Sequence, residues 1–131
     1  MFRLEKRKIF LLYQYYLIGN IPNFTSENEK DEKRLIWFSD CLKKEKNLRE
    51  KIDKKLKIGW DFSRLPHLEK SILIYATYEL FSEQNSQYIK SIISQIINFS
   101  KVYLETSKYA YINKVLDLLV KEETTLLKKE V

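Results

Sequence analysis

Hydrophobic side chains recur at helical spacing from the start of the chain. The first series follows i, i+3, i+4, i+7, i+8, which places its members on one stripe of an amphipathic helix: Ile9, Phe10, Leu12, Tyr13, Tyr16 and Leu17. Gly19 to Pro22 ends this helix, with Gly19 suited to the C-cap. Ser26 and Glu29 have the spacing of a capping box, and they lead into a second helix whose inner face is Leu35, Phe38 and Leu42.

Four more helices are predicted further along. The spacing of Leu48, Ile52 and Leu56 predicts a third helix that ends near Gly59. Pro66 suits the first turn of a fourth helix, whose buried side is Leu68, Ile72, Leu73, Ala76 and Leu80. A fifth carries Ile89, Ile92, Ile93, Ile96 and Ile97. The last is capped by Thr106 or Ser107 and turns Tyr109, Ile112, Leu116 and Leu119 inward, with a frayed tail over residues 124–131.

Composition narrows the fold to an all-α class. The chain has 131 residues but only 2 glycines and 2 prolines. A β-sandwich needs a turn every 8 to 12 residues or so, and a doubly wound α/β fold needs glycines in its βα turns. We therefore expect a single helical domain over residues 1–131.

The residues for enzymatic chemistry are scarce. Cys41 is the only cysteine and His67 the only histidine, which argues against a disulfide framework, a metal site and a Cys–His nucleophile pair. The two glycines are far apart, so they form no phosphate-binding loop, and no apolar run is long enough to span a bilayer. The sequence thus favours a cytoplasmic binding protein, with no catalytic activity and no cofactor.

Positive charge is concentrated in the first half of the chain. Residues 1–66 carry 16 Lys and Arg against 10 Asp and Glu, whereas residues 67–131 carry 8 of each, so the first half holds the whole net charge of +6. One cluster is Arg3, Lys6, Arg7 and Lys8, beside an aromatic-rich helix; another spans Lys43 to Lys57. Such clusters attract polyanions, although a lysine-rich helix face is often only a solvated surface.

Three stretches together resemble the NusB family of bacterial transcription antitermination factors. The longest runs from Leu68 to Leu80 and contains Glu69-Lys70, Ile72-Leu73 and Ala76-Thr77-Tyr78-Glu79-Leu80. The second is Tyr111-Ile112-Asn113-Lys114-Val115-Leu116-Asp117, and the third is Leu12-Tyr13-Gln14 after basic residues. They occur in the family's order and cover roughly residues 3–120.

The resemblance implies a fold of about six to seven helices, arranged as two three-helix bundles packed crosswise. It also implies binding of boxA-type single-stranded RNA in ribosomal leader transcripts, together with ribosomal protein S10, within the transcription elongation complex. On the family's pattern, Arg3, Lys6, Arg7 and Lys8 contact RNA along with Ser107 and Lys108, while Tyr13 and Glu69 face S10.

Departures from the family pattern leave alternatives open. Glu5 interrupts the basic run, Ile74 stands where an arginine is common and Lys114 replaces a usual glycine, so RNA binding is expected to be weak or to need S10. A helical protein-interaction module without sequence-specific RNA binding is the main alternative. The N-terminal domain of some ribosomal RNA cytosine methyltransferases is also NusB-like, so part of such an enzyme is the second alternative if this chain is a fragment. A first helix lying on anionic membrane is the third alternative, and burial of its apolar stripe would exclude it.

Overall fold

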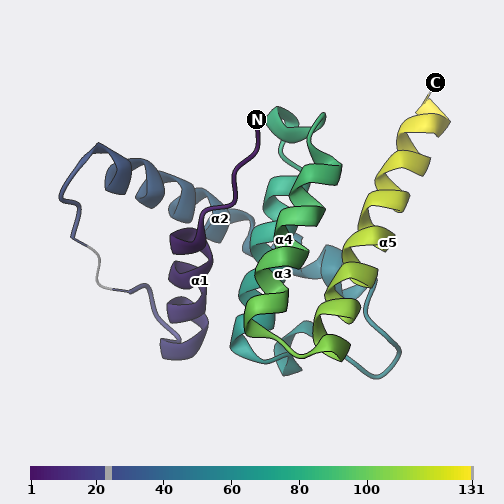
Figure 1. The fold of residues 1–131 in the computed structure, drawn as a ribbon, viewed down its shortest axis with the longest axis horizontal. Coiled ribbons are helices and arrows are strands. Elements are labelled where there is room, and N and C mark those ends of the chain that lie inside the picture. Colours follow the sequence, from purple (N-terminus) through teal and green to yellow (C-terminus); the bar gives the residue numbers. More distant parts are fainter. Residues whose placement is uncertain (23–24, 131) are drawn as a thin grey trace.

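In a computed structural model, the described residues form five α-helices and two short 3-10 helices (Figure 1). The structure describes residues 1–22 and 25–130, with side chains as far as residue 122. In chain order the elements are α1 (Lys6–Ile18), α2 (Glu29–Asp53), η1 (Phe62–Arg64), α3 (His67–Leu80), η2 (Glu83–Asn85), α4 (Ile89–Tyr103) and α5 (Thr106–Glu130). No strand occurs among these described residues, and the predicted all-α class is confirmed.

The helix count is lower than expected because two predicted helices are one. α2 runs unbroken for 25 residues from Glu29 to Asp53, and it absorbs the separate helix predicted around Leu48 and Ile52. No glycine or proline separates the two apolar series, and the lysines between them form the solvent-exposed side of a long helix. The start also differs, since the Asn28 side chain accepts the Asp31 N–H at 2.9 Å and caps α2 in place of Ser26.

α3 is the central helix of the domain. Ten of its residues are buried, among them Ile72, Leu73 and Ile74 with no exposed surface, because every other α-helix packs against it or its neighbours. α1 and α2 cover one side, and α4 and α5 cover the other (Figure 1). The two helical groups therefore share α3 and one hydrophobic core.

α1 packs inward rather than onto a membrane. Ile9 and Leu12 are fully buried against α3, as predicted, and Leu11 is buried beside them. Leu17 was predicted to face inward, but it is 56% exposed because it lies in the last turn before Gly19, beyond the reach of the core. The centre of the stripe, Ile9 and Leu12, therefore lies inside the domain and cannot enter a membrane surface. Among the described residues, no helix has the length and apolar character needed to span a bilayer.

The last helix extends further than the periodicity indicated. Ile112, Leu116 and Leu119 are buried as predicted, and the backbone of α5 continues to Glu130. The expected tail at 124–131 has side chains that lie outside the described residues.

Candidate nucleic-acid interface

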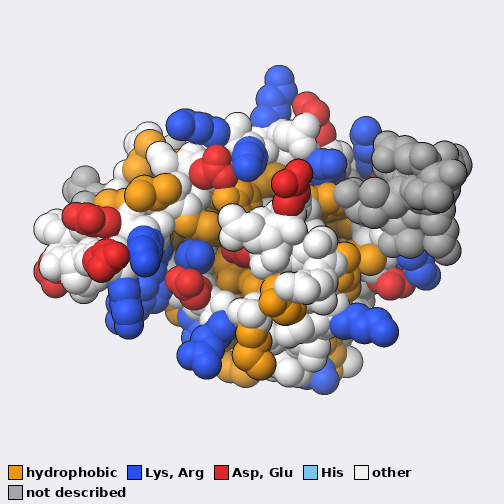
Figure 2. All heavy atoms as spheres, turned by 90° about the horizontal axis from the view of Figure 1, so that it is seen from above, with side chains coloured by type: hydrophobic (Ala, Val, Ile, Leu, Met, Phe, Trp, Pro, Cys, Tyr) orange, Lys and Arg blue, Asp and Glu red, His pale blue; other side chains and the backbone are white. Residues whose placement is uncertain are grey.

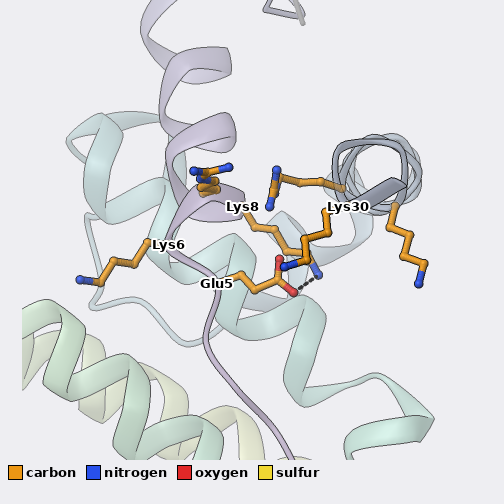
Figure 3. A pocket seen from close by; sticks show the side chains of 7 residues that line it. Glu5, Lys6, Lys8 and Lys30 are labelled. Atoms are coloured by element: carbon orange, nitrogen blue, oxygen red, sulfur yellow. Dashed lines mark ion pairs between the residues drawn. The ribbon is translucent and has the colours of Figure 1, made fainter. Parts of the chain in front are cut away.

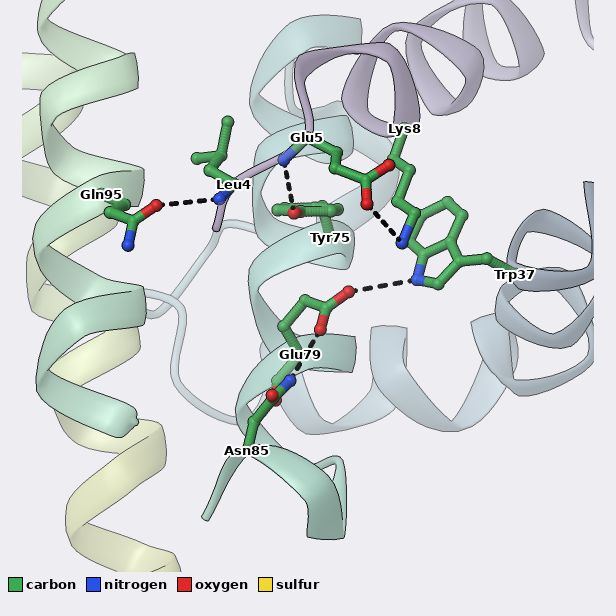
Figure 4. Close-up of polar contacts among 8 residues, drawn as sticks. All are labelled: Leu4, Glu5, Lys8, Trp37, Tyr75, Glu79, Asn85 and Gln95. Carbon is green, nitrogen blue, oxygen red and sulfur yellow. Dashed lines mark hydrogen bonds and ion pairs between the residues drawn. The ribbon is translucent and has the colours of Figure 1, made fainter. Parts of the chain in front are cut away.

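The leading segment, residues 1–5, is an extended strap fixed to α3 and α4 (Figure 4). The Leu4 N–H donates to Gln95 Oε1 at 2.8 Å, and Gln95 Nε2 donates to the Phe2 carbonyl at 2.9 Å. The Glu5 N–H donates to the Tyr75 hydroxyl at 3.0 Å. Phe2 is buried while Arg3 is exposed, because successive side chains of an extended chain alternate in direction. The fold thus holds Arg3 outward from a fixed backbone.

The four basic residues predicted to bind RNA have different environments. Arg3, Lys6 and Arg7 are exposed, and none of the ion pairs among the described residues involves them. Lys8 is largely covered: its Nζ lies 3.5 Å from Glu5 Oε1 and 5.0 Å from the centre of the Trp37 ring. Three of the predicted cations are therefore free for a ligand, and the fourth helps to hold the interface together.

A basic groove of about 400 Å³, the leading-end groove, lies between the start of α1 and the start of α2 (Figure 3). Seven residues line it, and all except Glu5 are basic: Lys6, Arg7, Lys8, Lys30, Lys33 and Arg34. In Figure 3, Lys8 and Lys30 lie on one side of the leading segment and Lys6 extends on the other. Seen from above, Lys and Arg side chains gather where α2 begins, with acidic side chains among them (Figure 2). Positive charge thus flanks the strap on both sides.

The α2 side of this groove was missed by the sequence analysis. Lys30, Lys33 and Arg34 share one helix face by their spacing, but the sequence analysis singled out only the apolar inner face of this helix. Arg34 is held in place, since its Nη1 lies 2.8 Å from Asp31 Oδ1. Lys33 Nζ is 3.6 Å from Glu29 Oε1 in an exposed pair, whereas Lys30 belongs to no ion pair among the described residues. Lys30 is thus the α2 side chain best placed to meet an anion.

A buried carboxylate lies beneath Lys8 (Figure 4). Glu79 Oε1 accepts from Trp37 Nε1 at 3.1 Å, and Glu79 Oε2 accepts from Asn85 Nδ2 at 2.7 Å. Burial raises the pKa of Glu79, while the Lys8 charge and these two donors oppose the rise. The network fixes the Trp37 ring on which the Lys8 ammonium rests.

The start of α5 brings two other predicted residues together. Lys108 Nζ lies 3.5 Å from Glu69 Oε1, and Glu69 is only 6% exposed. Ser107 is exposed next to it, and the amides of Lys108 and Tyr109 bond to the Glu105 carbonyl at 3.0 and 3.1 Å. The preceding N–H groups, of Thr106 and Ser107, therefore face outward from the helix start, where an anion is favoured. A residue predicted to bind RNA and a residue predicted to face S10 thus form one ion pair.

Tyr13 does not take part in that ion pair. It is half-buried on α1, and no hydrogen bond, ion pair or ring contact of the described residues joins it to Glu69. Two aromatic residues that the sequence analysis did not pair lie together: Trp60, 55% exposed, has its ring centre 6.4 Å from that of Tyr111, one turn after Lys108. The exposed Trp60 ring offers stacking to an unpaired base.

Among the residues that the structure describes, no three His, Cys, Asp or Glu side chains are grouped as a metal site requires.

Comparisons with known proteins agree with the sequence resemblance. The model of the NusB family matches residues 12–121. A transcription antitermination protein NusB of Sulfurimonas denitrificans is 31% identical over 125 residues, covering 88% of this chain and 92% of that protein. The NusB protein of Nitratiruptor is 32% identical over 124 residues, covering 87% and 86%. That of Fervidobacterium nodosum is 37% identical over 65 residues, which span 50% of this chain and less than half, 45%, of the relative. No solved structure gives a significant match.

Proposed function

Because this chain belongs to the NusB family of transcription antitermination factors, we propose that it binds boxA-type single-stranded RNA of ribosomal leader transcripts together with ribosomal protein S10. The observation that carries the proposal is the anchored leading segment, which displays Arg3, Lys6 and Arg7 beside a groove lined mainly by basic residues. Single-stranded RNA supplies phosphates for such cations and unstacked bases for aromatic rings.

The RNA contacts lie at two places, the leading-end groove and the start of α5. Lys6, Arg7 and Lys30 meet phosphates in the leading-end groove, and Arg3 meets them from the leading segment beside it. Ser107 and the N–H groups at the start of α5 meet the same strand, and Lys108 is kept near it by Glu69. Lys8 contributes indirectly, because its pair with Glu5 and its position over Trp37 hold the first turn of α1 in place.

S10 binds beside the RNA, with the half-buried Tyr13 as its anchor. Glu69 is too buried for a broad contact, so its part is to orient Lys108 where RNA and S10 meet. Tyr13→Ala is then expected to remove the increase in RNA affinity that S10 causes, while the affinity for RNA alone stays unchanged. If S10 raises the RNA affinity of wild type and of Tyr13→Ala equally, S10 binds another surface.

The direct test compares boxA RNA with a scrambled RNA, with and without S10, over a range of salt. Replacing Arg3, Lys6 and Arg7 by glutamine should lower the slope of log affinity against log salt by about two, since each phosphate contact on a single strand contributes about 0.7. Lys46, Lys54 and Lys57, exposed lysines that line none of the described grooves, give the matched control. The control should keep most of the slope.

Three results would contradict the proposal. Equal affinity for boxA and scrambled RNA in the presence of S10 would leave only general polyanion binding. Equal slopes for the leading-end triple variant and its control would mean that RNA binds another surface. Tight binding of S10 with no RNA binding would support the alternative of a protein-interaction module.

A further inference from the structure

A second cationic groove lies where the latter half of α2 meets the end of α3. It has a volume of about 670 Å³, compared with about 400 Å³ for the leading-end groove. Its principal residues are Lys44, Asn47 and Lys51 from α2, Tyr78 and Phe81 around the end of α3, and Gln84 from η2. We name it the α2–α3 groove.

Each aromatic ring in this groove carries an ammonium group over its face. Lys44 Nζ lies 5.4 Å from the centre of the Tyr78 ring, and Lys51 Nζ lies 4.6 Å from that of Phe81. The Tyr78 hydroxyl donates to Asp40 Oδ2 at 2.6 Å, and Lys44 Nζ lies 3.1 Å from the same oxygen. This triad fixes the Tyr78 ring and neutralises the Asp40 charge at the edge of the groove.

The two grooves are connected along one side of α2. Lys8 rests over Trp37, whose ring centre is 5.5 Å from that of Tyr78, and Tyr78 lies under Lys44. Lys33, Trp37, Lys44 and Lys51 are separated by four and then seven residues, which keeps them on one side of a helix. At 1.5 Å per residue, Lys33 and Lys51 are about 27 Å apart along the axis. Cations and rings thus alternate from one groove to the other.

We propose that the α2–α3 groove binds single-stranded RNA that continues from the strand held at the leading end. This inference rests on the proposed function, because it extends the same ligand to a second site. The groove offers ammonium groups for phosphates and the amides of Asn47 and Gln84 for base edges. When Lys44 and Lys51 turn toward phosphates, the ring faces beneath them become available for base stacking. An acidic peptide could satisfy the two ammonium groups, but it would make no use of the ring faces. Glu83 at the rim also disfavours a ligand made of carboxylates.

The test uses RNA of two lengths and three variants of the full chain, namely two double variants and the leading-end triple variant described above. Lys44→Gln with Lys51→Gln removes the two groove cations; Lys46→Gln with Lys54→Gln removes two exposed lysines of the same segment that line neither groove. For an RNA long enough to extend beyond boxA, the first variant should lower the salt slope by about 1.4, twice the single-strand value of about 0.7, and the control should lower it much less. For the short boxA RNA, the two double variants should behave alike.

Photo-crosslinking gives a readout independent of charge. The long RNA carrying 4-thiouridine in its flanking part should crosslink to the peptide that holds Tyr78 and Phe81, and Lys44→Gln with Lys51→Gln should reduce this crosslink. Crosslinks confined to the leading end, or equal slopes for the groove variant and its control, would overturn the inference.

The leading-end triple variant separates this failure from that of the proposed function. If it loses affinity while the groove variant matches its control, the proposed function stands and the extension fails. If the triple variant keeps full affinity and the groove variant does not, the leading end is the wrong surface and the α2–α3 groove is itself the RNA site.

Discussion

Gln95 on α4 is expected to position the cations proposed to bind RNA without itself touching RNA. Its side chain makes two hydrogen bonds to the main chain of the leading segment, at 2.8 Å from the Leu4 N–H and 2.9 Å to the Phe2 carbonyl. A third bond, 3.0 Å to Ser91 Oγ, stays within α4. Gln95→Ala removes both bonds to the strap and leaves Arg3 and Lys6 in the sequence.

The magnitude follows from the two lost bonds. Each contributes about 1 kcal/mol, so docking of the segment weakens by about 2 kcal/mol, or about 30-fold in its equilibrium constant. Burial of Phe2 and the bond from the Glu5 N–H to the Tyr75 hydroxyl remain. The apparent RNA affinity is proportional to the fraction of molecules in which the segment is docked. The loss of affinity should therefore be at most about 30-fold.

Hydrogen exchange of the Glu5 amide provides the measurement. This amide bonds to Tyr75 and not to Gln95, so it reports opening of the whole segment rather than loss of its own acceptor. We expect exchange to accelerate by up to about 30-fold in Gln95→Ala, and to stay at the wild-type rate in Ser94→Ala, an exposed control on the same helix. Wild-type exchange of Glu5 in Gln95→Ala would refute the argument that Gln95 holds the strap.

Three further predictions concern stability and reactivity. Gly19 ends α1 at φ +82° with open space around it, so Gly19→Ala should lower the free energy of unfolding by about 1 to 2 kcal/mol through backbone strain alone; an unchanged denaturant midpoint would contradict this. Burial raises the pKa of Cys41 to about 12, so iodoacetamide at pH 8 should label it only after unfolding, and mass spectrometry should find the native thiol unmodified. Because burial raises the pKa of Glu79, its contribution to stability is greatest below the ordinary carboxyl pKa and decreases as pH rises through the raised one. The stability of Glu79→Gln relative to wild type should therefore increase with pH across that interval, and a constant difference in chemical denaturation would show that Glu79 titrates normally.

Helical periodicity predicted the elements wherever one face is buried. The isoleucines of α4 illustrate this: Ile92 and Ile96 are fully buried, and Ile89, Ile93 and Ile97 pack at the edge of the core. It failed at α2, because a gap in the apolar series looked like a break between helices. The structure shows that gap to be an exposed stretch, which a helix tolerates when its residues have good helix propensity.

The interface was predictable only where it is local in sequence. Arg3, Lys6 and Arg7 cluster at one end of the chain, and that clustering alone singled them out as candidates. The covering of Lys8 depends on Trp37, and the far side of the leading-end groove depends on Lys30. Both lie on another helix, and only the packing of α1 with α2 against α3 brings them to the leading segment.

The central position of α3 determines how the domain unfolds. Each helical group uses a different side of this one helix, so neither retains a complete interior if the other detaches. The architecture has two parts, but heat or denaturant should melt it in a single step, and expressing either half alone should give an unfolded polypeptide.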